Sequence, residues 1–274
     1  MKNLFFLLLI AITVSCSKAN EKKYTGSTPA TAAVVRNFLN IPLTDSVDFI
    51  RWQLTLGDNE YELQANYGIG KPNTNGFING GQHISLSGTV TKKNNMLLLK
   101  NAGKTFRMAW LNDNLLHLAN DDNSLLNGTG GWSYTLNSLA PVSTTQINFL
   151  AKPAVLNDSM SYQGRTPCKV PGVIVREECY KIKWWIIFYA DSATHEPNTY
   201  KLFGTNWRKE GSKTGSWKMI TEKDGRTIYQ MNNDNGSPFL RLLKLDEQIL
   251  MFTDANGKLP VGDHDFSYTL NKKW

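Results

Sequence analysis

The sequence predicts a mainly β protein, built as two tandem small antiparallel meander β-barrels, each with at most one short helix. The first observation is an internal repeat, in which residues 106–137 align with residues 240–271 at a constant offset of 134 without a gap. Ten of these 32 pairs are identical, and a chance match would lose its offset over such a length. The second observation is a period-two alternation of apolar and polar residues, interrupted by turn residues at regular intervals. We therefore expect two copies of one β unit.

The repeat also fixes the expected boundaries of the two units. With gaps, it continues upstream in three short matches: 24–29 with 162–167, 49–52 with 181–184, and 61–63 with 200–202. The segment between the copies contains prolines and a Ser-Thr-Thr run, and it lacks clear alternation. We expect the first β-barrel unit at 24–137, a linker at 138–161 and the second β-barrel unit at 162–274.

The first fifteen residues predict a signal peptide. Lys2 precedes an apolar run that is too short to cross a bilayer core of about 30 Å, for which a helix needs roughly 20 residues. Small and aliphatic residues directly before Cys16 resemble the bacterial lipobox, which implies a lipoprotein whose Cys16 carries the acyl chains, such as palmitate. The alternative is an ordinary secreted protein with an incidental cysteine. Residues 16–23 are expected to form the lipidated tether.

This N-terminus predicts the location and the first partner of the protein. Two or more acyl chains give stable membrane anchoring, so we expect a lipid anchor on Cys16 and no transmembrane span. Ser17 follows the cysteine in place of the Asp that favours inner-membrane retention in well-studied bacteria, which favours the outer membrane, facing the periplasm or the surface. The net charge of +7 is dispersed, without an arginine-rich stripe, so we expect no nucleic-acid partner.

Two cysteines remain after Cys16, and the repeat indicates how they are used. Cys168 and Cys179 align with Ala30 and Val47, so the first copy lacks both of them. Joint gain or loss in an oxidising compartment predicts a disulfide. The alternative, a metal or redox dithiol, would favour a Cys-x-x-Cys motif or a nearby histidine, and the sequence has neither around these positions.

The alternation predicts seven strands in each unit. We expect them at 49–56, 60–67, 84–91, 96–100, 105–111, 115–119 and 132–136, and at 181–190, 198–205, 214–221, 226–231, 239–245, 249–254 and 265–270. A helix is expected at 30–39, with Pro42 beyond its end. The repeated Ser-Tyr-Thr-Leu-Asn should be the closing strand, with Tyr134 and Tyr268 on one face and the neighbouring Ser and Thr on the other.

The second unit resembles the N-terminal domain of the envelope lipoprotein NlpE. The resemblance rests on four motifs, at 162–168, 215–218, 239–245 and 249–257, together with the lipobox. It implies a lipocalin-like barrel, present here as a tandem duplication, and an envelope role in copper tolerance, surface sensing or stress signalling. The family's Cys-x-x-Cys is absent, because Cys168 is followed by Lys169, Val170 and Pro171.

The sequence contains none of the catalytic motifs that would indicate an enzyme. The chain has no nucleophile elbow, phosphate loop or His-Glu-x-x-His motif, and its four histidines lack ligand spacing and are expected on the surface or in loops. We therefore expect no catalytic residue, no metal site and no cofactor. The leading hypothesis is a noncatalytic binding or sensing module. The alternatives are a structural or assembly component of the envelope and, less favoured, an enzyme.

The glycine-rich loop 66–82 is the candidate recognition site of the sequence. It carries Phe77 among glycines that include Gly68, Gly80 and Gly81. Such loops contact small ligands or partner proteins when a rigid scaffold presents them, so an envelope protein or a small ligand is the expected partner. A long flexible hairpin tip explains the same composition.

Overall fold

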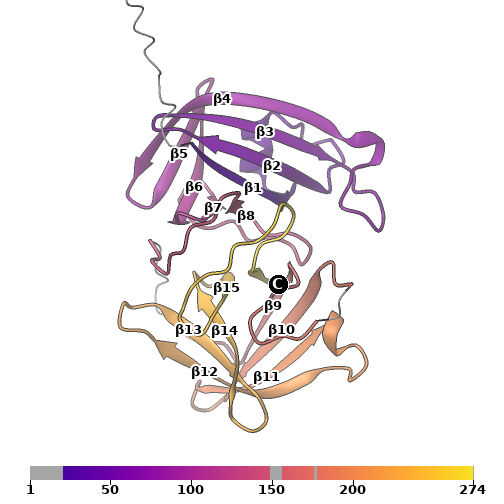
Figure 1. The fold of residues 1–274 in the computed structure, drawn as a ribbon, viewed down its shortest axis with the longest axis vertical. Helices are drawn as coiled ribbons and strands as arrows, with labels where there is room; N and C mark the ends of the chain where they lie inside the picture. Colours follow the sequence, from indigo (N-terminus) through magenta and orange to yellow (C-terminus); the bar gives the residue numbers. More distant parts are fainter. Residues whose placement is uncertain (1–20, 149–155, 176–177, 274) are drawn as a thin grey trace, which may run out of the picture.

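The chain folds into two closed eight-stranded antiparallel barrels, which confirms the predicted fold class. The structure is a computed structural model that describes residues 21–148, 156–175 and 178–273. In Figure 1 the first barrel, coloured indigo to magenta, lies above the second, coloured orange to yellow. Among the helices in these ranges, none has the length and apolar character needed to cross a membrane.

The first barrel is a meander in which every strand pairs with the next and β1 closes on β8. Its elements are β1 (Lys22–Pro29), α1 (Ala33–Leu39), β2 (Phe49–Leu56), β3 (Glu60–Gly68), the 3-10 turn η1 (Ile78–Gly80), β4 (Gln82–Lys93), β5 (Met96–Asn101), β6 (Lys104–Asn112), β7 (Leu115–Ala119) and β8 (Thr135–Ser138).

The second barrel repeats this topology, with β9 closing on β16. Its elements are β9 (Ser159–Thr166), β10 (Ile182–Ala190), β11 (Pro197–Gly204), the 3-10 turn η2 (Thr205–Trp207), β12 (Lys213–Thr221), β13 (Thr227–Asn232), β14 (Pro238–Lys244), β15 (Ile249–Thr253) and β16 (Thr269–Lys272).

Each barrel has an eighth strand that the alternation did not predict. β1 begins inside the expected tether and β9 begins inside the expected linker. Both contain Tyr-x-Gly-x-Thr, where a glycine replaces the apolar residue of an ordinary alternation. The glycine is required because the closing strand passes close by: a Cβ on Gly26 would lie 2.9 Å from Thr135 O, and one on Gly164 would lie 2.6 Å from Thr269 O.

Aromatic side chains fill the interior of both barrels. In the first, the Trp52 ring lies 6.0 Å from the Phe106 ring, which stacks at 4.9 Å on Phe38 of α1. In the second, Phe188 packs on Trp217 at 4.9 Å and on Tyr229 at 5.5 Å. Together with the aliphatic residues of each core, this packing supplies apolar burial that stabilises each barrel.

The two copies share their internal hydrogen bonds as well. Trp52 Nε1 donates to Thr28 Oγ1 at 2.9 Å, and Trp184 Nε1 donates to Thr166 Oγ1 at 2.8 Å. The threonines belong to the Thr-Pro pairs that end β1 and β9, so the duplication holds in side-chain detail.

The repeated motifs do supply the closing strands, although β8 and β16 begin at Thr135 and Thr269, later than the expected 132 and 265. The polar face of each motif joins the barrels. Tyr134 and Tyr268 point into their own barrels. On the other face, the hydroxyl oxygens of Ser133 and Ser267 lie 2.6 Å apart, and those of Thr135 and Thr269 lie 2.9 Å apart. The rings of the preceding Trp132 and Phe266 stack at 5.1 Å with an interplanar angle of 4°. Each residue contacts its own counterpart, as residues do on the axis of a symmetric dimer. The barrels therefore pack about a pseudo-two-fold axis.

Apolar side chains from both barrels surround this axis in one shared core. The contributing positions correspond at the repeat offset of 134: Ala109 and Leu243, Leu111 and Leu245, Leu115 and Ile249, and Leu125 and Leu259. All of them are buried. The barrels are thus one packed unit across the faces they share.

The predicted disulfide is confirmed between Cys168 and Cys179, whose Cα atoms lie 5.9 Å apart. It crosslinks the connection from β9 to β10, where the first barrel has α1. We expect the double variant Cys168→Ser/Cys179→Ser to lose about 2 kcal/mol of unfolding free energy, since the closed loop is short. Urea unfolding followed by tryptophan fluorescence measures this loss. Dithiothreitol should shift the wild-type midpoint and leave the double variant unchanged, and equal wild-type and variant midpoints would contradict the prediction.

Candidate functional site

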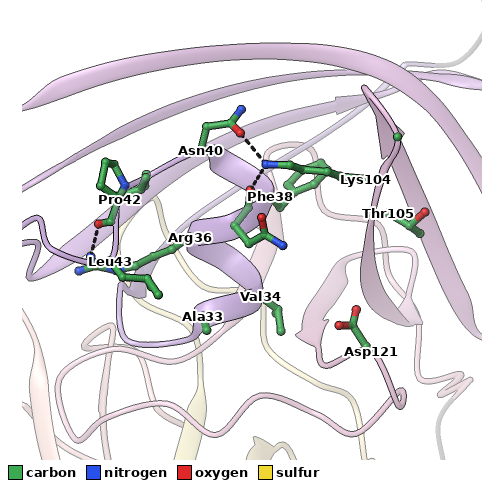
Figure 2. Close-up of a pocket in the computed structure, with 13 residues that line it drawn as sticks. Ala33, Val34, Arg36, Phe38, Asn40, Pro42, Leu43, Lys104, Thr105 and Asp121 are labelled. Carbon is green, nitrogen blue, oxygen red and sulfur yellow. Dashed lines mark hydrogen bonds between the residues drawn. The ribbon is translucent and has the colours of Figure 1, made fainter.

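Each barrel has an open cleft beside the connection between its first and second strands, and the two clefts are of similar size. The first has a volume of about 820 Å³ and lies between α1 and the turn from β5 to β6, as Figure 2 shows. The second has a volume of about 800 Å³ and lies between the disulfide loop and the segment that begins with η2. Both volumes are in the range of small-molecule sites.

The two cations of the first cleft, Arg36 and Lys104, hold the helix. Arg36 Nε donates to Ala30 O at 2.6 Å, and its Nη1 donates to Pro42 O at 2.8 Å. Lys104 Nζ donates to Asn37 O at 2.6 Å and to Asn40 Oδ1 at 2.5 Å, at the end of α1 (Figure 2). A cation on the last carbonyls of a helix is favourable. These contacts explain both side chains as structural.

The second cleft is basic. Among the described residues that line it are the cations Lys181, Lys183, Arg208 and Lys209 and the acids Glu178 and Glu210. Ile174 adds an apolar side chain that is 96% exposed. A concave surface with an excess of positive charge attracts anions and raises their local concentration. This cleft is the better candidate for a ligand.

The glycine-rich loop is packed against the barrels. Phe77 is 7% exposed and stacks on Phe49 at 4.2 Å, so its ring is not presented to solvent. Gly81 lies under it, because a Cβ there would be 3.0 Å from the Phe77 ring. Gly68 is beside Gly81, whereas a Cβ on Gly80 would meet nothing within 4 Å. The loop thus brings Gly68, Phe77 and Gly81 together, and its role as a ligand site stays a prediction.

Asp265 of the second barrel is held by three donors of the first, a link that the sequence reasoning missed. Its Oδ1 accepts from Arg51 Nη2 at 2.8 Å and from Ser27 Oγ at 3.2 Å, and its Oδ2 accepts from Asn75 Nδ2 at 2.6 Å. Arg51 Nη2 also donates to Asn75 O at 2.6 Å. The glycine-rich loop is therefore tied to the second barrel through Asn75.

One histidine contradicts the expectation of surface or loop positions. His117 lies in β7 and is fully buried, whereas His83, His195 and His264 are exposed. Its ring nitrogens lie 2.9 Å from Thr135 Oγ1 and 2.9 Å from Leu126 O, and burial lowers its pKa to about 4. Strand alternation was the missed signal, because Leu115 and position 117 share the face of β7 that packs on the other barrel.

Metal ligands do not gather in the part of the chain that the structure describes. No three His, Cys, Asp or Glu side chains within those residues are placed to hold an ion together. Cys16 and the signal peptide at 1–15 lie outside the described residues. Comparisons of the chain with protein-family models, with curated proteins and with solved structures find no match.

Proposed function

We propose that the chain is a lipid-anchored envelope lipoprotein that acts as a noncatalytic binding or sensing module. The observation that carries the binding role is the basic cleft of about 800 Å³ on the second barrel. Its concave shape and excess of cations suit an anionic ligand. The lipobox before Cys16 supports the anchor, and the outer membrane is the proposed location.

A noncatalytic role is supported by how the polar and aromatic side chains are used. The barrel interiors are occupied by stacked rings, and Arg36 and Lys104 of the first cleft are hydrogen-bonded to backbone carbonyls. General acid–base catalysis needs a titratable side chain within hydrogen-bond reach of the reacting group, with a pKa near the operating pH. Beside the acids Asp121, Glu178 and Glu210, the two clefts offer cations and backbone groups for binding.

The context that we propose, envelope stress sensing or copper homeostasis, rests on the NlpE resemblance. Cys168 and Cys179 are bonded to each other, so a copper(I) ion would need ligands other than these thiolates. A thermal-shift screen of the full chain with copper(I), copper(II), fatty acids and small organic anions tests the binding role. A melting temperature that no compound moves would count against it.

Lipidation gives the sharpest test of the anchor. We expect Cys16→Ser to move the protein from the membrane to the soluble fraction, with at least about a tenfold change in the ratio, because stable anchoring needs the acyl chains. Fractionation with immunoblotting measures the ratio, and intact-mass spectrometry reads the acyl chains directly. The variant Cys168→Ser/Cys179→Ser is the control and should stay on the membrane. Membrane retention of Cys16→Ser would refute the anchor.

A further inference from the structure

The pseudo-two-fold axis gives the Asp265 link a counterpart on the other side of the interface. Ser27 and Arg51 are directly opposite each other across β1 and β2, and Asp265 of the second barrel binds both of them. The equivalent cross-strand pair on β9 and β10 is Arg165 and Lys183. The residue of the first barrel that corresponds to Asp265 is Gly131. The counterpart site therefore has two cations where the first has a serine and an arginine, and a glycine where the first has a carboxylate.

Gly131 lies against the guanidinium of Arg165. A Cβ on this glycine would be 3.5 Å from Cζ and from Nη1 of Arg165. These are ordinary contact distances, so a side chain could be placed there without a clash. The space beside Arg165 at Gly131 therefore corresponds to the space that the Asp265 carboxylate fills on the other side of the axis. At Gly131 the chain supplies no carboxylate for it.

Lys181 adds a third positive charge. Burial lowers the pKa of Lys181, repulsion from Arg165 and Lys183 lowers it further, and attraction to Asp265 raises it. Burial also lowers the pKa of the Arg165 guanidinium. Across the described ranges, no ion pair within 4.0 Å joins any of the three cations to a carboxylate. The three cations repel one another, Asp265 offsets part of this repulsion at Lys181, and a bound anion would relieve more of it.

Aromatic surface lies beside these charges. Lys181 Nζ is 5.3 Å from the centre of the Phe266 ring and 5.2 Å from that of Tyr180, which is 57% exposed. Lys181 and Lys183 also line the basic cleft. A ligand that pairs its charge with the cations can therefore place an apolar part against Tyr180.

We propose that Arg165, Lys181 and Lys183, facing Gly131, form a binding site for the carboxylate of a small organic acid. The ligand class follows from Asp265, whose carboxylate is bound at the equivalent place by the equivalent strand positions. A guanidinium matches the planar geometry of a carboxylate, and the lysines add charge. This inference rests on the proposed binding role and names the ligand class of the site that shares Lys181 and Lys183 with the basic cleft.

Succinate titration of the full chain in nonionic detergent, at constant ionic strength set with sodium chloride, tests the site. We expect the melting temperature to rise with succinate and to saturate with a dissociation constant of about 1 mM, as for a small ligand of few atoms. A rise that sodium chloride alone reproduces would overturn the proposal. Inorganic phosphate and phosphatidylglycerol in mixed micelles of the same detergent are run in parallel, and binding of either that is at least about tenfold tighter would overturn the carboxylate assignment.

A matched pair of variants at Gly131 separates this site from general charge effects. Gly131→Asp should supply the carboxylate internally, so it should raise the melting temperature without ligand and abolish the succinate response. Gly131→Asn fills the same space without the charge, so it should also weaken succinate binding but should not raise the melting temperature without ligand. Arg165→Gln/Lys183→Gln should lose the response. An unchanged response in Gly131→Asp would overturn the site.

The outcomes also separate this site from the proposed function. If succinate fails while another compound of the screen moves the melting temperature, the anion site is wrong and the binding role stands. If succinate binds while Cys16 carries no acyl chain, the anchor is wrong and the anion site stands.

Discussion

The variant Gly262→Ala is expected to lose about 4 kcal/mol of unfolding free energy. A Cβ at this position would overlap Phe266 O and lie 2.7 Å from Asn137 Oδ1, so the interface between the barrels has to open. Overpacking costs about 1–3 kcal/mol, and leaving buried polar groups without partners costs a similar amount. Here Gly262 N–H donates to Asn137 Oδ1 at 2.9 Å, and Asn137 Nδ2 donates to Asp263 O at 3.1 Å.

Chemical denaturation with tryptophan fluorescence measures the effect, and the repeat provides its own replicate. Gly128 occupies the equivalent position, donates to Asn271 Oδ1 at 2.8 Å, and should show a comparable loss in Gly128→Ala. Gly57→Ala is the control, because a Cβ there would lie 3.5 Å from its nearest neighbour, Glu60 O. A Gly262→Ala protein as stable as Gly57→Ala would show that the barrels do not pack as described.

The duplication explains why so much of the fold is predictable from one sequence. An exact offset over 106–137 located both closing strands, and it showed that Cys168 and Cys179 are absent together from the first copy. Strand alternation then located the strands between them. The alternation did not predict the strands β1 and β9 because Gly26 and Gly164 interrupt their apolar face. Both positions need a glycine because the closing strand passes close to them.

The arrangement of the two barrels was not predictable in the same way. On an isolated strand, the Ser and Thr of the repeated motif are typical of a solvent-exposed face, whereas here Thr135 and Thr269 are buried against each other. The available signal was that outward positions such as Leu115 and its counterpart Ile249 are apolar in both copies. The Asp265 link joins residues 214 positions apart, so pattern reading cannot find it without the axis.

The candidate site shows the same limit. The glycine-rich loop was chosen for its composition, but composition does not tell whether its aromatic ring is exposed, and Phe77 stacks on Phe49. The basic cleft depends on residues of two separate segments that meet in space, the disulfide loop and the residues after η2. The strand register is needed to see that Arg165 and Lys183 occupy the positions equivalent to Ser27 and Arg51.

His117 sits at the end of a hydrogen-bonded chain that crosses the barrel interface. Leu126 O is an acceptor, so Nε2 of the ring carries the proton and Nδ1 accepts from Thr135. Thr269 then donates to Thr135, and Ser267 donates to Thr269 at 2.9 Å. A second proton on the ring would turn Nδ1 into a donor that faces the Thr135 hydroxyl. Protonation therefore requires the whole chain to reverse or to break.

Acid is consequently expected to weaken the protein through this one group. Burial lowers the pKa of His117 to about 4 from the usual 6.5. Between these two pH values the unfolded chain binds a proton that the folded chain does not bind. Stability is therefore intact above pH 6.5 and is lost as the pH falls towards 4. The full shift corresponds to about 3 kcal/mol.

The variant His117→Met isolates this contribution, because Met251 fills the equivalent place in the second barrel within the same shared core. Unfolding free energies are measured for both proteins at pH 7 and at pH 4. We expect wild type to lose about 3 kcal/mol more than the variant over this range. Carboxyl groups titrate in both proteins and cancel in the comparison. Equal losses would mean that His117 accepts its proton in the folded state and that the hydroxyl chain tolerates reversal.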